Sequence, residues 1–226
     1  MRKRFYCMKK YILFDLDGTL TDSHEGIIKS ARYALESEGV IENDDEVMKR
    51  YIGPPLIDSL QVFHGFSKEQ AERGLSKYRE RYNTVGLYEN EMYTGIDKCL
   101  ERLKASNKVI ALATCKPEPI AKRIIEHFNL AQYFDVVVGS LDVTRKYKVQ
   151  VIQEVFRQLK ELDKDFNKAN AIMIGDRKHD VLGAKEAGIE CIGVRFGFAE
   201  KGELEEAGAD YIVDTVDSLA DFILSL

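Results

Sequence analysis

Short apolar runs rich in β-branched residues recur along the chain, separated by longer stretches in which apolar residues return every three or four positions. The short runs are typical of strands buried on both faces, and the longer stretches are typical of amphipathic helices. Because the two alternate, the pattern predicts a mainly parallel sheet covered by helices on both faces, an α/β fold. The runs that predict strands lie at 11–15, 109–114, 135–139, 171–176, 191–196 and 211–214.

One long interval interrupts this alternation. From about residue 22 to 92 the sequence holds no convincing strand, only helical patterns such as the one that joins Ile27 to Ala31. We interpret residues 22–92 as an inserted helical domain, with residues 1–21 and 93–226 forming the core. Open parallel sheets bind ligands beyond the carboxyl ends of their strands, and the insert directly follows the first strand, so we expect it to cap the site.

Composition narrows the class of protein. A chain of 226 residues with 45% hydrophobic and 31% charged residues can bury one full-sized core and a smaller second one. A net charge of −5 with mixed signs argues against a nucleic acid polymer as partner. No apolar run approaches the roughly 20 residues of a membrane span, so we expect no membrane partner either.

Cysteine usage and the first residues bear on the compartment. The cysteines Cys7, Cys99, Cys115 and Cys191 are widely spaced, which predicts neither a disulfide framework nor a thiolate zinc site. We therefore expect a reducing, cytoplasmic location. Met8 would make an equally sensible start of the chain, and residues 1–7 would then be a disordered extension.

The first apolar run ends in two carboxylates and a glycine. Residues i and i+2 of an extended chain point the same way, so Asp15 and Asp17 should project together. Clustered carboxylates repel each other, and a bound divalent cation would offset that repulsion; Mg²⁺ prefers oxygen ligands of this kind. Gly18 would let the backbone bend close to a ligand. Taken alone, this pair would also suit a hydrated acidic turn.

Polar residues follow two later strands as well. Thr114 and Cys115 end the second core run, and a threonine in this position would also suit a helix cap. Asp176 ends the run at 171–176, and Asp180 lies one turn into the next helix. There Asp180 could hold a metal-bound water or cap the helix.

Together, these motifs resemble those of the haloacid dehalogenase superfamily, a group of aspartate-dependent phosphotransferases. The segments FDLDGTLTDS, LATCKP and MIGDRKHD stand in the family's order, each at the end of a strand, and the resemblance covers the chain from about Met8 to the last strand. The resemblance implies a Rossmann-like parallel sheet core with an inserted α-helical cap domain. It also implies a Mg²⁺-dependent phosphatase.

Carried to this sequence, the family chemistry makes Asp15 the nucleophile that forms an aspartyl phosphate and Asp17 the acid and base. The metal ligands would be Asp15, Asp176 and, through its backbone carbonyl, Asp17, with Asp180 holding a metal-bound water. The family's third motif is a lysine that opens a helix, and Lys148 suits it best, with Lys146 and Arg145 as near competitors. The phosphate would be bound by Gly18, Thr114, Cys115 and Lys148.

The position of the insert bears on substrate. Caps placed between the first two motifs occur in phosphoglycolate phosphatases, in pyrophosphate-splitting relatives and in some nucleotidases. The stretch at 87–93, together with GDRKHD, resembles bacterial members labelled 5′-nucleotidase-like or phosphoglycolate phosphatase-like. The loop with Gly53, Pro54 and Pro55 resembles one that sets substrate specificity in such caps, or it is a rigid turn between two helices. We expect a small phosphorylated metabolite as substrate.

Two alternatives share the motifs. A hexose-phosphate mutase has both aspartates, but mutases often carry a different residue where Thr19 stands. A non-catalytic binding module on the same fold is also conceivable, since fold does not fix function, although such a module would be expected to lose Asp15 or Asp17.

Overall fold

The computed structural model describes residues 8–141 and 144–226. It divides into two compact units: one holds the chain up to Thr21 together with Met92–Leu226, and the other holds Asp22–Glu91. The predicted extension at residues 1–7 lies outside the described residues. No helix among the described residues is both long enough and apolar enough to cross a membrane.

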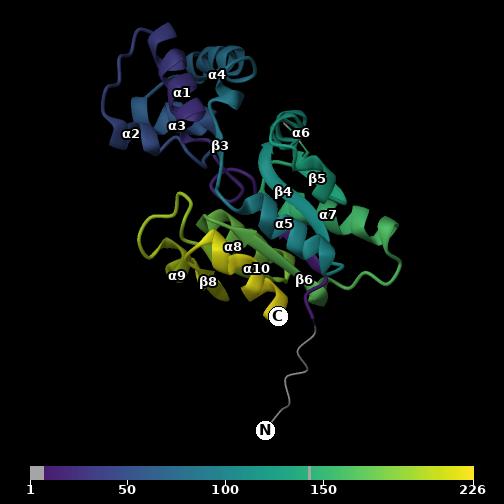
Figure 1. Cartoon of the computed structure of the whole chain (residues 1–226). Helices are drawn as coiled ribbons and strands as arrows, with labels where there is room; N and C mark the ends of the chain where they lie inside the picture. Colours follow the sequence, from purple (N-terminus) through teal and green to yellow (C-terminus); the bar gives the residue numbers. More distant parts are fainter. Residues whose placement is uncertain (1–7, 142–143) are drawn as a thin grey trace. The chain divides into compact units, whose positions relative to one another are not determined.

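The first unit is built on one parallel sheet, in which all six predicted strands are confirmed (Figure 1). The strand Tyr11–Phe14 pairs with a neighbour on each side, so that Phe14 lies opposite Leu112 on one and Ile174 on the other, and all of its residues are buried. The strands are β1 Tyr11–Phe14, β4 Val109–Pro117, β5 Val136–Ser140, β6 Ala171–Gly175, β7 Glu190–Val194 and β8 Tyr211–Val213, in the order β5-β4-β1-β6-β7-β8.

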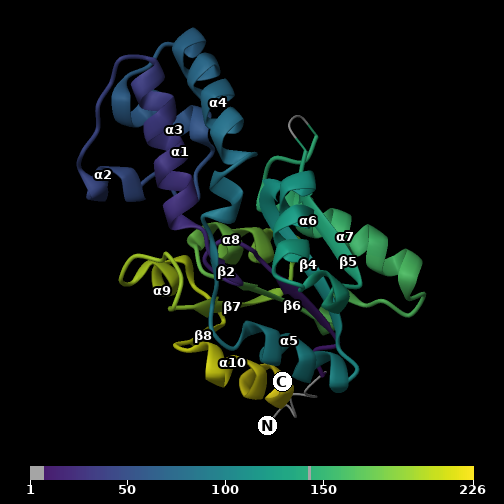
Figure 2. The ribbon, with the colours of Figure 1, turned by 45° about the horizontal axis from the view of Figure 1, so that its top comes forward.

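Helices cover both faces of this sheet, as Figure 2 shows. Tyr11 and Leu13 of β1 point to the face where α7 and α8 pack, whereas the alternate residues point to the opposite face, where α5 and α10 pack against each other. The helices are α5 Ile96–Ala105, α6 Glu118–His127, α7 Lys148–Leu162, α8 Lys178–Ala187, α9 Glu203–Ala207 and α10 Val216–Ser225, with short 3₁₀ turns η2 Ala131–Tyr133 and η3 Lys168–Asn170.

The second unit is helical. Its two long helices pack side by side, and Gly26 permits the close approach of a neighbouring turn, because a Cβ at Gly26 would lie 1.9 Å from the Gly86 carbonyl oxygen. Ser67 and Gln70 form a capping box that starts one of these helices. The elements are α1 His24–Ser37, α2 Asp45–Lys49, α3 Leu56–His64, α4 Lys68–Tyr82 and the 3₁₀ turn η1 Gly86–Tyr88.

Two short strands, β2 Thr21–Asp22 and β3 Glu91–Met92, pair with each other where the chain crosses between the units. They correct the expectation that the interval 22–92 holds no strand. Each is two residues long, which is too short to leave a periodic pattern in the sequence.

The loop with Gly53, Pro54 and Pro55 connects α2 to α3. Gly53 has a φ of 107°, a conformation that favours glycine, and Pro55 precedes the first residue of α3. The loop is thus a turn between two helices, and its role in substrate specificity stays a prediction.

Candidate active site

The chain turns sharply where β1 ends. Asp15 continues the pairing with β6, since its amide donates to the carbonyl of Ile174 over 2.9 Å. Gly18 then adopts a φ of 76°, and a Cβ on it would lie 2.0 Å from Oδ2 of Asp176. A glycine is therefore required at position 18, although what comes close to it here is the carboxylate of Asp176.

Three carboxylates converge beside this turn. Asp15, Asp176 and Asp180 each offer an oxygen, and these atoms all lie within 4.8 Å of one another. Parallel strands end at one edge of the sheet, which brings Asp15 after β1 together with Asp176 after β6. The carboxylate of Asp17 is outside this group.

Backbone and side-chain contacts fix the two later aspartates. Asp176 is fully buried, and its Oδ2 accepts from the amide of Phe198 over 2.7 Å while its Oδ1 accepts from Oγ1 of Thr19 over 3.2 Å. Asp180 caps α8, because its Oδ2 accepts from the amide of Arg177 over 3.1 Å. Its approach depends on Gly175, where a Cβ would lie 2.2 Å from the carboxyl carbon of Asp180.

Lys148, the first residue of α7, lies against the acidic group. Its Nζ is 2.9 Å from Oδ1 of Asp15 and 2.7 Å from Oδ1 of Asp180, and it donates to the carbonyl of Ala113 over 2.9 Å. Gly183 of α8 leaves space for this lysine, since a Cβ there would lie 2.6 Å from Cγ of Lys148. Of the three candidates for the third-motif lysine, Lys148 is thus the one that lies against Asp15.

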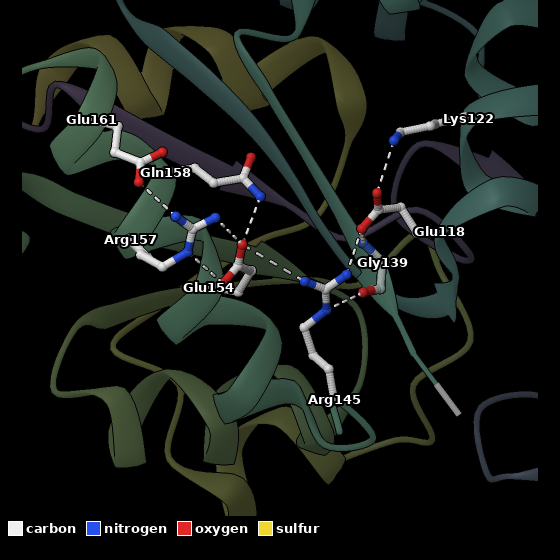
Figure 3. A network of polar contacts seen from close by, with 8 residues as sticks. All are labelled: Glu118, Lys122, Gly139, Arg145, Glu154, Arg157, Gln158 and Glu161. Atoms are coloured by element: carbon white, nitrogen blue, oxygen red, sulfur yellow. Dashed lines mark hydrogen bonds and ion pairs between the residues drawn. The ribbon is translucent and has the colours of Figure 1, made fainter. Parts of the chain in front are cut away.

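The two competitors of Lys148 lie elsewhere. Lys146 is exposed, with its ammonium 5.9 Å from the ring centre of Tyr147. Arg145 is buried in a separate polar network, in which its guanidinium donates to the carbonyl of Gly139 and to Glu118 (Figure 3).

Burial shapes the charge of the site. Burial raises the pKa of Asp15 to about 6, with Lys148 opposing the rise and Asp180 adding to it. Burial also raises the pKa of Asp176 well above its ordinary value, helped by the negative charges of Asp180 and Asp15. For Lys148, burial acts to lower the pKa, but the two neighbouring carboxylates hold it well above its ordinary value, so the ammonium stays charged.

The donor set suits a divalent cation. The Oδ1 atoms of Asp15 and Asp180 are buried and have no hydrogen-bond partner within the described chain, although both form ion pairs with the ammonium of Lys148. The three clustered carboxylates of Asp15, Asp176 and Asp180, two of which pair with Lys148, leave an excess of negative charge when they are ionised. Clustered carboxylate oxygens are also the ligands that Mg²⁺ prefers.

The carboxyl end of β4 supplies the other residues expected to bind phosphate. Thr114 is buried, and its Oγ1 accepts from the amide of Lys116 over 3.1 Å. Cys115 is exposed to solvent, yet the protein atoms crowded around it raise the pKa of its thiol to about 11, against the opposing effect of Lys148. The thiol is therefore protonated at neutral pH.

Asp17 faces Lys116, a residue that the sequence did not single out. The ammonium of Lys116 donates to both carboxylate oxygens of Asp17, each over 2.9 Å. The motif containing Lys116 was recognisable, but its pairing with Asp17 requires the side-by-side placement of β1 and β4. The contacts of Thr19 and Phe198 with Asp176 likewise join segments far apart in the chain.

With this geometry in view, comparison with known proteins decides the family. Residues 12–194 match the sequence profile of the haloacid dehalogenase-like hydrolases. The chain belongs to this family. A 5′-nucleotidase of Pseudomonas aeruginosa is 42% identical to it over 195 residues, which cover 85% of this chain and 86% of the relative.

Other known proteins are also similar to this chain. The tyrosine-protein kinase PtkA of Mycobacterium tuberculosis is 35% identical over 213 residues, covering 93% of this chain and 71% of PtkA. A crystal structure described as a predicted phosphatase from Clostridium acetobutylicum matches with a TM-score of 0.89 and 42% identity, over 97% of this chain and 100% of that one. The chain is an enzyme of the phosphatase type within this family, with the six-stranded α/β fold of its structural neighbours.

Proposed function

We propose that the protein hydrolyses small phosphate monoesters with the help of Mg²⁺ and passes through an aspartyl phosphate on Asp15. The observation that carries the proposal is the cluster of Asp15, Asp176 and Asp180 at the carboxyl ends of β1 and β6, in which Asp15 and Asp180 form ion pairs with the ammonium of Lys148. A carboxylate next to a permanently charged lysine is suited to receive a phosphoryl group, because the lysine offsets the repulsion between two anions.

Each residue then has a distinct task. Asp15 attacks the phosphorus in line and displaces the ester oxygen, which takes a proton from Asp17. Asp17 next removes a proton from the water that attacks the acyl phosphate, and Asp15 is restored. Lys148, the hydroxyl of Thr114 and the amides around Gly18 and Cys115 would hold the remaining phosphoryl oxygens.

Mg²⁺ would be held by the carboxylates of Asp15 and Asp176, with a backbone carbonyl at Asp17 and with Asp180 as a direct ligand or through water. When bound, the cation supplies positive charge that stabilises the phosphoryl oxygens. The excess negative charge of the three carboxylates, and the burial that raises the pKa of Asp15 and of Asp176, support this assignment.

For the substrate we propose a small phosphorylated metabolite, with nucleoside 5′-monophosphates as the first class to examine. The relative from Pseudomonas aeruginosa, named a 5′-nucleotidase, supports this order. Phosphoglycolate is the second class, because a relative from Vibrio parahaemolyticus with 26% identity is named a phosphoglycolate phosphatase. We propose the cytoplasm as its location, supported by the free thiols of Cys99, Cys115 and Cys191.

The test is phosphate release from a panel of monoesters: nucleoside 5′-monophosphates, phosphoglycolate, sugar phosphates and pyrophosphate, each with and without Mg²⁺. The proposal predicts metal-dependent release that Asp15→Asn abolishes. Isomerisation of a hexose phosphate without net release would indicate a mutase instead. Full activity of Asp15→Asn, or of the wild type with excess chelator, would overturn the nucleophile or the metal assignment, respectively.

A further inference from the structure

A second lysine of the site, Lys116, contacts the residue to which we assign the proton transfers. Its side chain is 6% exposed and that of Asp17 is 22% exposed, with the ammonium 2.9 Å from both carboxylate oxygens of Asp17. Lys148 forms ion pairs with Asp15 and Asp180, whereas Lys116 forms one with Asp17, so the two lysines contact different carboxylates of the site.

The local backbone fixes where Lys116 stands. β4 and β5 pair in regular register up to Ala113, and the register shifts before pairing resumes at Pro117. An irregularity of this kind re-aims the side chains that follow it. The hydroxyl of Thr114 accepts the amide of Lys116 over 3.1 Å and so closes a local turn at this point.

A partly buried polar network holds the segment that follows Lys116. Glu118 accepts from the amide of Gly139 over 3.3 Å and from Arg145, which in turn donates to the carbonyl of Gly139 over 2.6 Å (Figure 3). The two backbones touch closely, since a Cβ on Gly139 would lie 2.4 Å from Cα of Glu118 and 2.6 Å from the carbonyl oxygen of Lys116. The backbone of Lys116 is therefore held against β5.

From these contacts we propose that Lys116 is a positioning residue for Asp17. When Asp17 is ionised, the ammonium of Lys116 donates to both of its oxygens. When Asp17 carries the proton that it gives to the ester oxygen, its other oxygen still accepts from Lys116, so in both forms the contact fixes the rotation of the carboxyl group and keeps it apart from Asp15, Asp176 and Asp180. Without Lys116, Asp17 would be free to turn toward that group or toward a cation held there, and it would lose its alignment with the ester oxygen. The inference rests on the proposed function, in which Asp17 transfers the proton.

The decisive experiment compares leaving groups. An alkyl phosphate must receive a proton as its alkoxide leaves, whereas 4-nitrophenolate leaves without one, so only the alkyl ester depends on a well-placed Asp17. We measure kcat/KM, which reports the steps up to transfer of the phosphoryl group to Asp15, for 4-nitrophenyl phosphate and for the alkyl monoester that the enzyme hydrolyses fastest. For Lys116→Met we expect kcat/KM to fall about 10- to 100-fold with the alkyl ester and less than about 3-fold with the aryl ester. The first loss is a part of the ~10²–10⁴-fold acceleration that general acid–base catalysis supplies.

A double-mutant cycle separates positioning from other roles. If Lys116 acts through Asp17, adding Lys116→Met to Asp17→Asn should not lower kcat/KM for the alkyl ester any further. Lys116→Arg, which keeps charged donors, should recover much of the loss. Lys164→Met, at an exposed turn of the same unit, is the matched control and should match the wild type. Thermal unfolding of each variant checks that it folds.

Equal losses with both esters, or additive effects in the cycle, would overturn the inference and indicate a role in substrate binding or in folding. An unchanged Lys116→Met enzyme would overturn it as well. In both cases the proposed function stands, provided that the wild type is active and Asp15→Asn is not. A wild type inactive on both esters would overturn the proposed function, and the role of Lys116 with it.

Discussion

Burial of the ionised Asp15 carboxylate should lower the free energy of unfolding. An amide of the same shape at this position should not have this effect. The side chain of Asp15 is 14% exposed, and burial raises its pKa from 3.8 to about 6 in spite of Lys148. In the unfolded chain the carboxyl titrates near its ordinary value, so between these two values the folded protein binds more protons than the unfolded one. Stability therefore falls as pH rises through this window, and near pH 8 the loss from this group amounts to about 3 kcal/mol.

We therefore expect metal-free Asp15→Asn to be more stable than the wild type, by about 2–3 kcal/mol near pH 8 and by roughly half of that near pH 5. Asparagine keeps the size of the side chain and an oxygen that can accept from Lys148, so little packing changes. Urea unfolding with a chelator present, at both pH values, measures the difference from the midpoint at an unchanged slope.

A residue of the same unit, Asp163, offers a control in which the substitution by asparagine should lower stability instead of raising it. Asp163 accepts from Lys10 and Tyr11, and these hydrogen bonds, led by that of Lys10, lower its pKa to about 2. Asp163→Asn should therefore reduce stability near neutral pH, with the loss fading as the pH falls from about 3.8 toward 2. The reasoning is refuted if Asp15→Asn is no more stable than the wild type near pH 8, or if its gain is the same near pH 5.

Two further predictions concern the acidic group. Mg²⁺ at about 100 times its dissociation constant should stabilise the wild type by about 2.7 kcal/mol, which corresponds to a rise in Tm of roughly 5–10 °C in a thermal scan. Asp176→Asn should lose most of that rise. If the rise is undiminished in this variant, Asp176 is not a ligand. Gly175→Ala should lower the free energy of unfolding in urea by about 1–3 kcal/mol and also lower kcat, because the new methyl group would lie 2.2 Å from Asp180 and push it away from Lys148. A variant with the stability and kcat of the wild type would contradict this packing.

The sheet could be predicted because its strands are buried on both faces, which leaves unbroken apolar runs such as the one ending at Phe14. The positions of Asp15 and Asp176 at one edge follow from parallel pairing alone. The start of α7 at Lys148 was also foreseeable, since the apolar helical pattern begins directly after it.

The partners within the site could not be predicted in the same way. The pairing of Lys116 with Asp17 depends on the register shift at the end of β4, which no periodicity records. The sequence allowed two roles for Asp180, a helix cap or a place near the metal. In the structure one of its carboxylate oxygens caps α8 while the other faces Lys148. A sequence pattern that fits either role does not reveal that a single carboxylate can serve both.

The pairing of β2 with β3 has a consequence for how such a protein can change. The chain leaves the sheet unit and returns to it through two segments that lie next to each other, so the inserted unit has neighbouring ends. A segment whose two ends lie next to each other can be removed and the gap closed by a short turn, or it can be replaced by a segment of another length. Either change costs little chain entropy. Such an exchange leaves the spacing of β1, β4 and β6 untouched. The helical insert can thus be replaced without a change in the strands whose ends carry Asp15 and Asp176.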